Sequence, residues 1–205
     1  MWMPTWQCLG LIFLIVAAFF IGFFVNAYHF LAVTSRLPNP DVLIIEDWMP
    51  ESVLQAAAEE FEKGSYHHLL ISGFDISGND HPLHNQIKST ASQRIIALGV
   101  PENQIIECFV KSPDISRSLA MARSANDTLQ KRNIESMGVT VMAPSVHARK
   151  TRMVYRRAML SGTPVGVIAV PTGHHNSSGW WMSSPTAKAV IISYAGLIYE
   201  WVTGF

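Results

Sequence analysis

The sequence predicts an α/β protein: a Rossmann-like, doubly wound, mainly parallel five-stranded sheet preceded by one N-terminal transmembrane helix. Three observations predict it. Short apolar runs alternate with longer amphipathic ones, which is typical of strands joined by crossover helices. Proline and glycine stand where helices should begin and end, and a long uncharged apolar run lies near the N-terminus. The 205 residues allow one core of ordinary size, and zero net charge argues against a nucleic-acid-binding protein.

The first element is the apolar run. Residues 9–25 read LGLIFLIVAAFFIGFFV, and the uncharged stretch continues to Ser35. About 20 helical residues cross the hydrocarbon layer of a bilayer, so we expect residues 9–33 to contact lipid as an uncleaved single-pass anchor. The alternatives are a cleaved signal peptide and a buried core helix. The absence of Lys and Arg from residues 1–7 and the length of the run disfavour a signal peptide.

The remaining elements follow in order. Strands are expected at residues 41–46, 68–72, 104–110, 139–143 and 165–170. Helices are expected at residues 51–63, about 85–98, 116–136, 147–160 and 185–203. Near-continuous apolar strands indicate a parallel sheet covered on both faces. The chain therefore divides into an anchor with its flanks (1–35), a linker (36–40) and an α/β domain (41–205).

This fold class predicts where a ligand binds. Ligands of open α/β sheets bind beyond the carboxyl ends of the strands, near the switch in strand order. The sequence has no dinucleotide-binding glycine motif, no P-loop, no nucleophile elbow and no CxxC pair, so the common signatures of nucleotide binding and nucleophilic catalysis are absent. The polar residues at the predicted strand ends are the remaining candidates.

Segment 145–150, SVHARK, is the most informative of these strand ends. It follows a strand and begins a helix, where backbone N–H groups favour an anion. His147 and Lys150 share one side of the helix, whereas Arg149 points elsewhere. Arg117 and Ser118 stand at a second strand-to-helix junction. The candidate ligand contacts are Ser72, Gly73, Arg117, Ser118, Ser145, His147, Arg149 and Lys150, with the strand-end acids Glu46, Asp47 and Asp75.

These cationic and hydroxyl groups predict a small anionic ligand, and His147 is the candidate acid or base because histidine side chains change charge near neutral pH. The alternative is that His147 caps the helix and the basic residues form a solvated face. His81 with His84, and His174 with His175, lack a fixed carboxylate or Cys partner, so no metal is predicted. The cofactor stays unknown.

Two further features have mainly structural interpretations. Cys108 lies in an apolar strand-like run and is expected to be a small buried hydrophobe rather than a nucleophile. Trp180 and Trp181 suit a ligand lid, a membrane-facing patch or packing of the last helix on the sheet. That last helix is too short and too interrupted to span a bilayer, and we expect it in the core or at the membrane interface.

Several short motifs resemble the ElyC/SanA/YdcF family over roughly residues 41–170. They are the first strand, residues 69–73 (LLISG), the Gly99-Val100-Pro101 turn, Arg117-Ser118 and Ser145-x-His147-x-x-Lys150, together with the subgroup-like features of residues 46–50 and Trp180-Trp181. The sequence departs from the family where Ala120 replaces an acid, where no acid occurs between Asp80 and Glu102, and where Lys150 replaces an Arg. These departures lower the expectation of hydrolytic activity.

The resemblance implies a bacterial cell-envelope protein, linked to peptidoglycan or lipid-carrier metabolism and barrier maintenance, with its domain on the periplasmic side of the inner membrane. A YdcF-like relative implies S-adenosylmethionine binding as a lesser alternative. A non-catalytic membrane-tethered assembly factor is the other. The residues themselves leave orientation open, because Arg36 is the one Lys or Arg close to either end of the apolar run and by itself favours a cytoplasmic domain.

Overall fold

The computed structural model describes residues 6–75, 89–111, 116–172, 177 and 179–203. Its helices are α1 (Trp6–Leu31), α2 (Glu51–Lys63), α3 (Thr90–Ala97), α4 (Arg117–Lys131), α5 (Ala148–Ala158) and α6 (Ser184–Thr203). Its strands are β1 (Val42–Glu46), β2 (His68–Asp75), β3 (Ile105–Lys111), β4 (Val139–Pro144) and β5 (Val165–Val170). Three short 3-10 turns are η2 (Glu102–Gln104), η3 (Ser145–His147) and η4 (Trp180–Met182).

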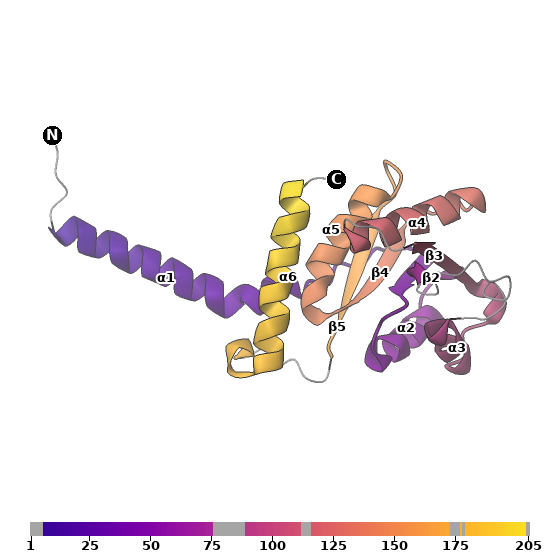
Figure 1. The fold of residues 1–205 in the computed structure, drawn as a ribbon, viewed down its shortest axis with the longest axis horizontal. Helices are drawn as coiled ribbons and strands as arrows, with labels where there is room; N and C mark the ends of the chain where they lie inside the picture. Colours follow the sequence, from indigo (N-terminus) through magenta and orange to yellow (C-terminus); the bar gives the residue numbers. More distant parts are fainter. Residues whose placement is uncertain (1–5, 76–88, 112–115, 173–176, 178, 204–205) are drawn as a thin grey trace.

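The five strands form one parallel sheet in the order β3-β2-β1-β4-β5, which confirms the predicted fold class (Figure 1). The chain builds outward from β1 through β2 to β3, then crosses back to place β4 on the other side of β1. The switch in strand order therefore lies between β1 and β4. This is the place where a doubly wound sheet leaves a crevice at its carboxyl edge.

The central strands β1 and β4 bury both of their faces, whereas the edge strand β3 is partly exposed. Leu43 and Ile45 of β1 pack with α2 and α3, whereas Val42 and Ile44 pack with α4 and α5. Because successive strand side chains point to opposite faces, a fully buried strand needs apolar residues at every position. The near-continuous apolar runs of the sequence follow from this requirement.

The helix boundaries agree with the local sequence signals where those signals are strong. α2 has the predicted bounds, with Pro50 before it and Gly64 as its C-cap. α4 ends at Lys131 rather than at the predicted residue 136, because Asn133 adopts a left-handed conformation that stops the helix. α3 begins after Ser89, whose side chain accepts a hydrogen bond from Ser92 N.

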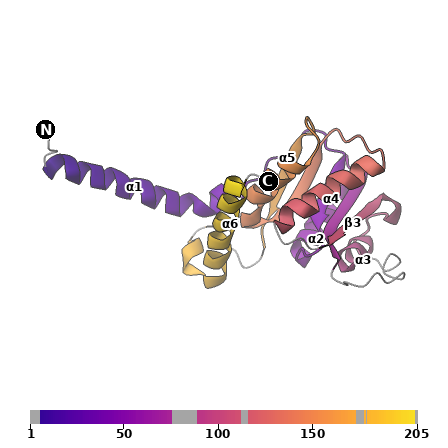
Figure 2. The ribbon, with the colours of Figure 1, turned by 45° about the horizontal axis from the view of Figure 1, so that its top comes forward.

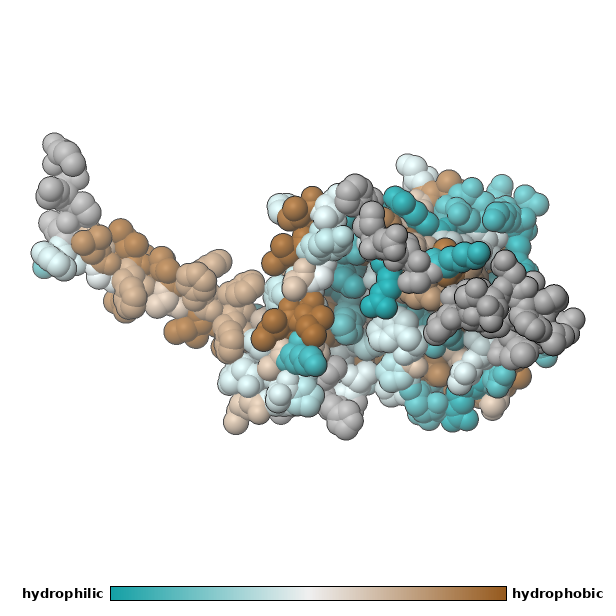
Figure 3. Space-filling view, in the orientation of Figure 1, coloured by the Kyte–Doolittle hydropathy of each residue, from teal (hydrophilic) through white to brown (hydrophobic). Residues whose placement is uncertain are grey.

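The anchor helix projects from the domain (Figure 2). α1 is long and apolar enough to cross a membrane, and its most apolar window is not buried. Its last turn is different: Ala27, Tyr28 and Leu31 are buried against α6 and η3. A few residues after α1, Ser35 forms an antiparallel bridge with Val167 of β5. In Figure 3 the apolar surface of α1 continues onto α6, which lies across the base of α1.

Candidate functional site

A polar cluster occupies the carboxyl edge of the sheet at the switch point. Glu46 is the last residue of β1 and is buried to 3% exposure. The Trp48 indole Nε1 donates a hydrogen bond of 2.6 Å to Glu46 Oε2. Burial raises the pKa of Glu46, while the Trp48 bond and the positive charge of Lys150 act in the opposite direction. The cluster therefore holds a carboxyl group whose protonated form burial favours.

Lys150 approaches this carboxyl group from the first turn of α5. Its Nζ donates a hydrogen bond of 3.0 Å to Ser118 Oγ near the start of α4. One ammonium group thus joins the N-terminal turns of two helices that follow different strands. Such a group can bind an anion together with backbone N–H groups at the helix ends.

His147 lies at the same edge, in η3 just before α5. Its Nδ1 is 3.1 Å from Ser193 Oγ of α6, and its ring meets the Trp48 ring edge-to-face with centroids 6.2 Å apart. His147 is half-buried between β1's carboxyl end and α6. A half-buried imidazole with a hydroxyl partner can move a proton to or from a ligand in the crevice.

The C-terminal helix α6 packs over this polar cluster between the carboxyl ends of β1 and β4, the region called the crevice below. Ser193 contacts His147, and one turn further along α6 Gly196 lies against the Lys150 side chain, where a Cβ would come within 3.2 Å of Lys150 Cδ. One turn further again, Glu200 is buried and accepts a hydrogen bond of 2.5 Å from Ser116 Oγ. Ser193, Gly196 and Glu200 therefore form one face of α6 over the site. Sequence reasoning missed all three, and the glycine inside an apolar helix was the signal that a neighbouring side chain passes close.

Two buried polar atoms near the crevice have no hydrogen-bond partner within the part of the chain that the structure describes: Tyr155 Oη and Asp47 Oδ1. Tyr155 is fully buried in α5. Burial, together with the charge of Glu46, raises its pKa well above the usual value for tyrosine, while the nearby Ser72 hydroxyl acts in the opposite direction. An unsatisfied buried hydroxyl costs stability, and a catalytic role is one of the explanations for such a group in a native protein. Besides the three residues of α6, the sequence analysis did not identify Tyr155, because its spacing marks it only as a core residue.

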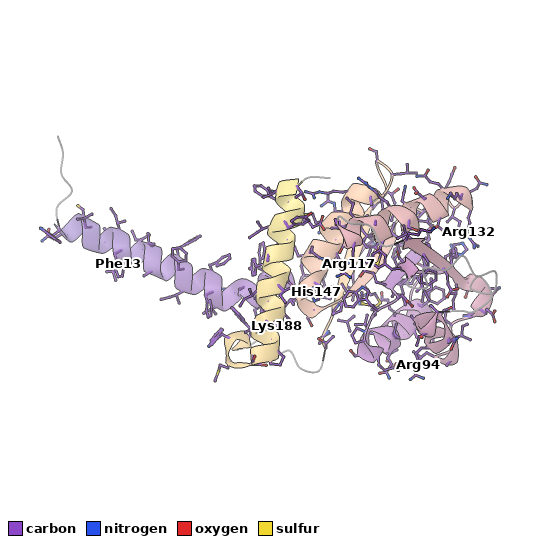
Figure 4. All side chains as sticks on the ribbon, viewed as in Figure 1. Phe13, Arg94, Arg117, Arg132, His147 and Lys188 are labelled. Atoms are coloured by element: carbon purple, nitrogen blue, oxygen red, sulfur yellow. The ribbon has the colours of Figure 1, made fainter. Side chains whose placement is uncertain are left out.

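The structure separates the predicted site residues. Glu46, Ser118, His147 and Lys150 come together at the switch point. Arg117 begins α4 beside this cluster and is exposed; Figure 4 shows it with His147 on the side of the domain that faces α6.

Other predicted residues have contacts within the fold. Ser72 Oγ donates to Met121 O, and Ser145 Oγ donates to Val170 O. Gly73 is packed so closely between Phe109 and Asp47 that a Cβ would meet the Phe109 ring at 2.6 Å. Arg149 turns away from the crevice and donates from Nε to Phe30 O of α1. The Asp75 side chain lies outside the described residues.

The remaining candidates are resolved differently. Cys108 is buried, as predicted, and burial raises the pKa of its thiol to about 11. Trp180 is buried against the anchor and not on the sheet: its Nε1 donates to Phe24 O over 3.0 Å. The histidine pairs 81/84 and 174/175 lie outside the described residues. Within the described ranges no group of three or more His, Cys, Asp or Glu side chains is placed to hold a metal ion.

Neither protein-family models nor curated proteins match this sequence.

Proposed function

We propose that this chain is a single-pass, membrane-anchored bacterial envelope protein whose α/β domain binds a small phosphorylated metabolite at the carboxyl edge of its sheet. The observation that carries the proposal is the convergence of Lys150, Ser118 and His147 at the switch point. A cation, a hydroxyl and an imidazole at helix N-termini are the groups that phosphate oxygens prefer. Arg117, exposed at the margin, adds a second positive charge that a ligand reaches from solvent.

The packing of the anchor supports its retention. Tyr28 and Leu31 of α1 are buried against α6 and η3, and Arg149 of the domain bonds to Phe30. Cleavage after α1 would remove these buried side chains and leave an apolar hollow on the domain. An uncleaved anchor therefore suits the fold better than a signal sequence does.

The envelope role and the periplasmic position of the domain are proposals that rest on the resemblance to the ElyC/SanA/YdcF family. Orientation is tested by two C-terminal fusions. Alkaline phosphatase is active only outside the cytoplasm, whereas green fluorescent protein fluoresces inside the cytoplasm and not when it is exported unfolded. Phosphatase activity without fluorescence is the expected result. The reverse result would overturn the periplasmic assignment.

Ligand binding is tested by thermal unfolding of the full-length protein in detergent. The probes are pyrophosphate, a uridine diphosphate sugar and S-adenosylmethionine. The proposal expects a rise in the unfolding midpoint with a phosphorylated probe, lost in Lys150→Gln and in His147→Ala. Lys63→Gln removes an exposed lysine of α2 that pairs with Glu59, and it is the matched control for charge. No shift with any phosphorylated probe, or an equal shift in Lys150→Gln, would refute the site; a shift with S-adenosylmethionine alone would favour the lesser alternative.

A second candidate function is that of a non-catalytic assembly factor. It is favoured by the internal partners within the crevice: Lys150 with Ser118, His147 with Ser193, and Ser116 with Glu200. Complementation of a deletion strain separates the two functions. Rescue by the double variant Arg117→Ala/His147→Ala at normal protein level would favour the assembly role, whereas loss of rescue supports ligand binding.

A further inference from the structure

A cavity of about 790 Å³ lies apart from the crevice, between the end of α1, the exposed side of α5 and α6. Aromatic and aliphatic side chains form two of its walls: Phe23 and Phe30 from α1, and Tyr194, Leu197 and Trp201 from α6. The third wall is different in kind. It comes from α5 and consists of Met153 and four arginines: Arg149, Arg152, Arg156 and Arg157.

Three of the four arginines donate hydrogen bonds to backbone carbonyl groups. Arg149 donates to Phe30 O and lies 3.9 Å from the centroid of the Phe30 ring. Arg152 Nε donates to Val165 O over 3.1 Å, and Arg157 donates to Glu200 O. Each bond uses one of the five N–H donors of a guanidinium, so the wall keeps donors for a ligand. Fixed guanidinium groups lose less freedom when they bind an oxyanion.

No carboxylate stands among the described residues that line this cavity. Between Arg149 and Arg157 the sequence has five basic residues and no acid. Burial is the main cause that lowers the pKa of Arg152, and the like charges of Arg156 and Arg149 lower it further. A bound anion would relieve this repulsion.

The cavity stands where a membrane surface would lie. Tyr194 of α6 packs on Phe23 and stacks on Phe30, with centroids 5.6 and 5.8 Å apart. From Trp6 to Phe23, α1 rises about 27 Å, close to the thickness of the hydrocarbon layer. The bilayer boundary therefore falls at the part of α1 that forms the cavity wall.

The orientation and surface of α6 support the same placement. In Figures 1 and 2 α6 crosses the base of α1 steeply, so that it lies along the surface of a bilayer that α1 spans. One side of α6 exposes apolar residues at helical spacing, which is typical of an interfacial helix. They are Ile191, Ile192, Ala195, Ile198, Tyr199 and Val202.

We propose that this cavity binds the headgroup of an anionic membrane phospholipid, with the arginines of α5 on the phosphate and the aromatic residues of α1 and α6 beside the acyl chains. Arg groups bind phosphate oxygens bidentately, and a mixed apolar and cationic cavity at a bilayer boundary matches a molecule that is charged at one end and apolar at the other. This site shares no side chain with Lys150 and His147, so it stands whether or not the crevice binds a metabolite.

The test uses the full-length protein in a non-ionic detergent, with three additives: phosphatidylglycerol, phosphatidylcholine and inorganic phosphate. Unfolding midpoints are measured as each is titrated. The proposal expects stabilisation by phosphatidylglycerol at concentrations where the other two have little effect. Arg152→Gln/Arg156→Gln should weaken the apparent affinity about tenfold or more, because each lost guanidinium removes charge-assisted bonds.

The matched control is Arg123→Gln/Arg132→Gln, which removes the same charge from exposed arginines of α4 and its C-cap. It should keep the response of the wild type, as should Lys150→Gln. Because a cavity variant can lose stability, Trp201→Ala provides a second cavity variant, at a residue that is 69% exposed. The stabilisation by lipid is measured for each variant relative to its own unfolding midpoint without lipid. Equal stabilisation by phosphatidylcholine, equal stabilisation by inorganic phosphate, or equal loss in the α4 control would overturn the proposal.

Discussion

Tyr155→Phe should stabilise this protein, although it alters a fully buried residue. Tyr155 is 0% exposed in α5, and its hydroxyl makes no hydrogen bond of good geometry among the described residues, although Ser72 lies near enough to act on its pKa. The substitution removes one oxygen atom and keeps the ring that packs in the core between α4, α5 and the sheet. The change therefore isolates the cost of one unsatisfied polar group.

The expected size follows from that cost. A buried donor without a partner costs about 1–3 kcal/mol, whereas the loss of ring packing is close to zero here. For a domain of this size each kcal/mol shifts the unfolding midpoint by about 2–4 °C. We expect the midpoint of Tyr155→Phe to rise by roughly 2–12 °C, measured by circular dichroism at 222 nm in detergent.

Tyr66→Phe is the matched control, because it makes the same chemical change at a buried tyrosine whose hydroxyl is satisfied. Tyr66 is 7% exposed and donates a hydrogen bond of 3.1 Å to Glu60 Oε1. Loss of a bond to a charged acceptor should lower stability by about 1.5–3 kcal/mol. The two variants should therefore shift in opposite directions. A fall in the midpoint of Tyr155→Phe would refute the reasoning, since it would show that the hydroxyl has a stabilising partner.

Three further predictions concern burial. The stability of Glu46→Gln relative to the wild type should increase as pH rises from 4 to 8. Burial raises the pKa of Glu46, so the folded wild type holds this proton more tightly than the unfolded chain does. The wild type therefore loses stability as pH rises through that raised pKa, whereas the Gln variant does not. A stability difference that does not change with pH would contradict this. Cys108 should stay unmodified by a thiol reagent at pH 7 until the protein is denatured, because burial raises its pKa to about 11, whereas exposed Cys8 reacts, as mass spectrometry would show. Leu31→Ala should cost about 2–5 kcal/mol by chemical denaturation in detergent, since Leu31 is fully buried between α1 and the domain; a cost under 1 kcal/mol would show that the anchor does not pack there.

The sequence predicted the sheet well because local chemistry decides it. The buried strands read as apolar runs, and Pro50 and Gly64 mark the ends of α2 independently of the rest of the chain. α4 was predicted too long because the stop at Asn133 depends on backbone conformation, which residue type suggests only weakly.

The candidate site was predictable in part for the same reason. His147 and Lys150 follow a strand end directly, so their placement at the carboxyl edge needs only the fold class. Glu200 and Ser116 are 84 residues apart, and their contact depends on where α6 docks, which no local pattern encodes. Arg149 turned to Phe30 for a similar reason: the position of α1 decides its direction.

α6 connects the two proposed binding regions, because its opposite sides form a wall of each. Ser193 and Gly196 face the crevice, whereas Tyr194 and Leu197 line the lipid-facing cavity. The contacts of α6 with Lys150 leave little room for a ligand beneath it, so a metabolite that enters must displace this helix or its side chains. Such a displacement also changes the cavity wall.

Any effect of lipid on metabolite affinity must then be matched by an equal effect of metabolite on lipid affinity, since coupling free energies between two sites are reciprocal. Titrations of pyrophosphate with and without phosphatidylglycerol, and of the lipid with and without pyrophosphate, should give the same affinity ratio; ratios of one in both directions would show that α6 stays fixed and that the two regions act independently.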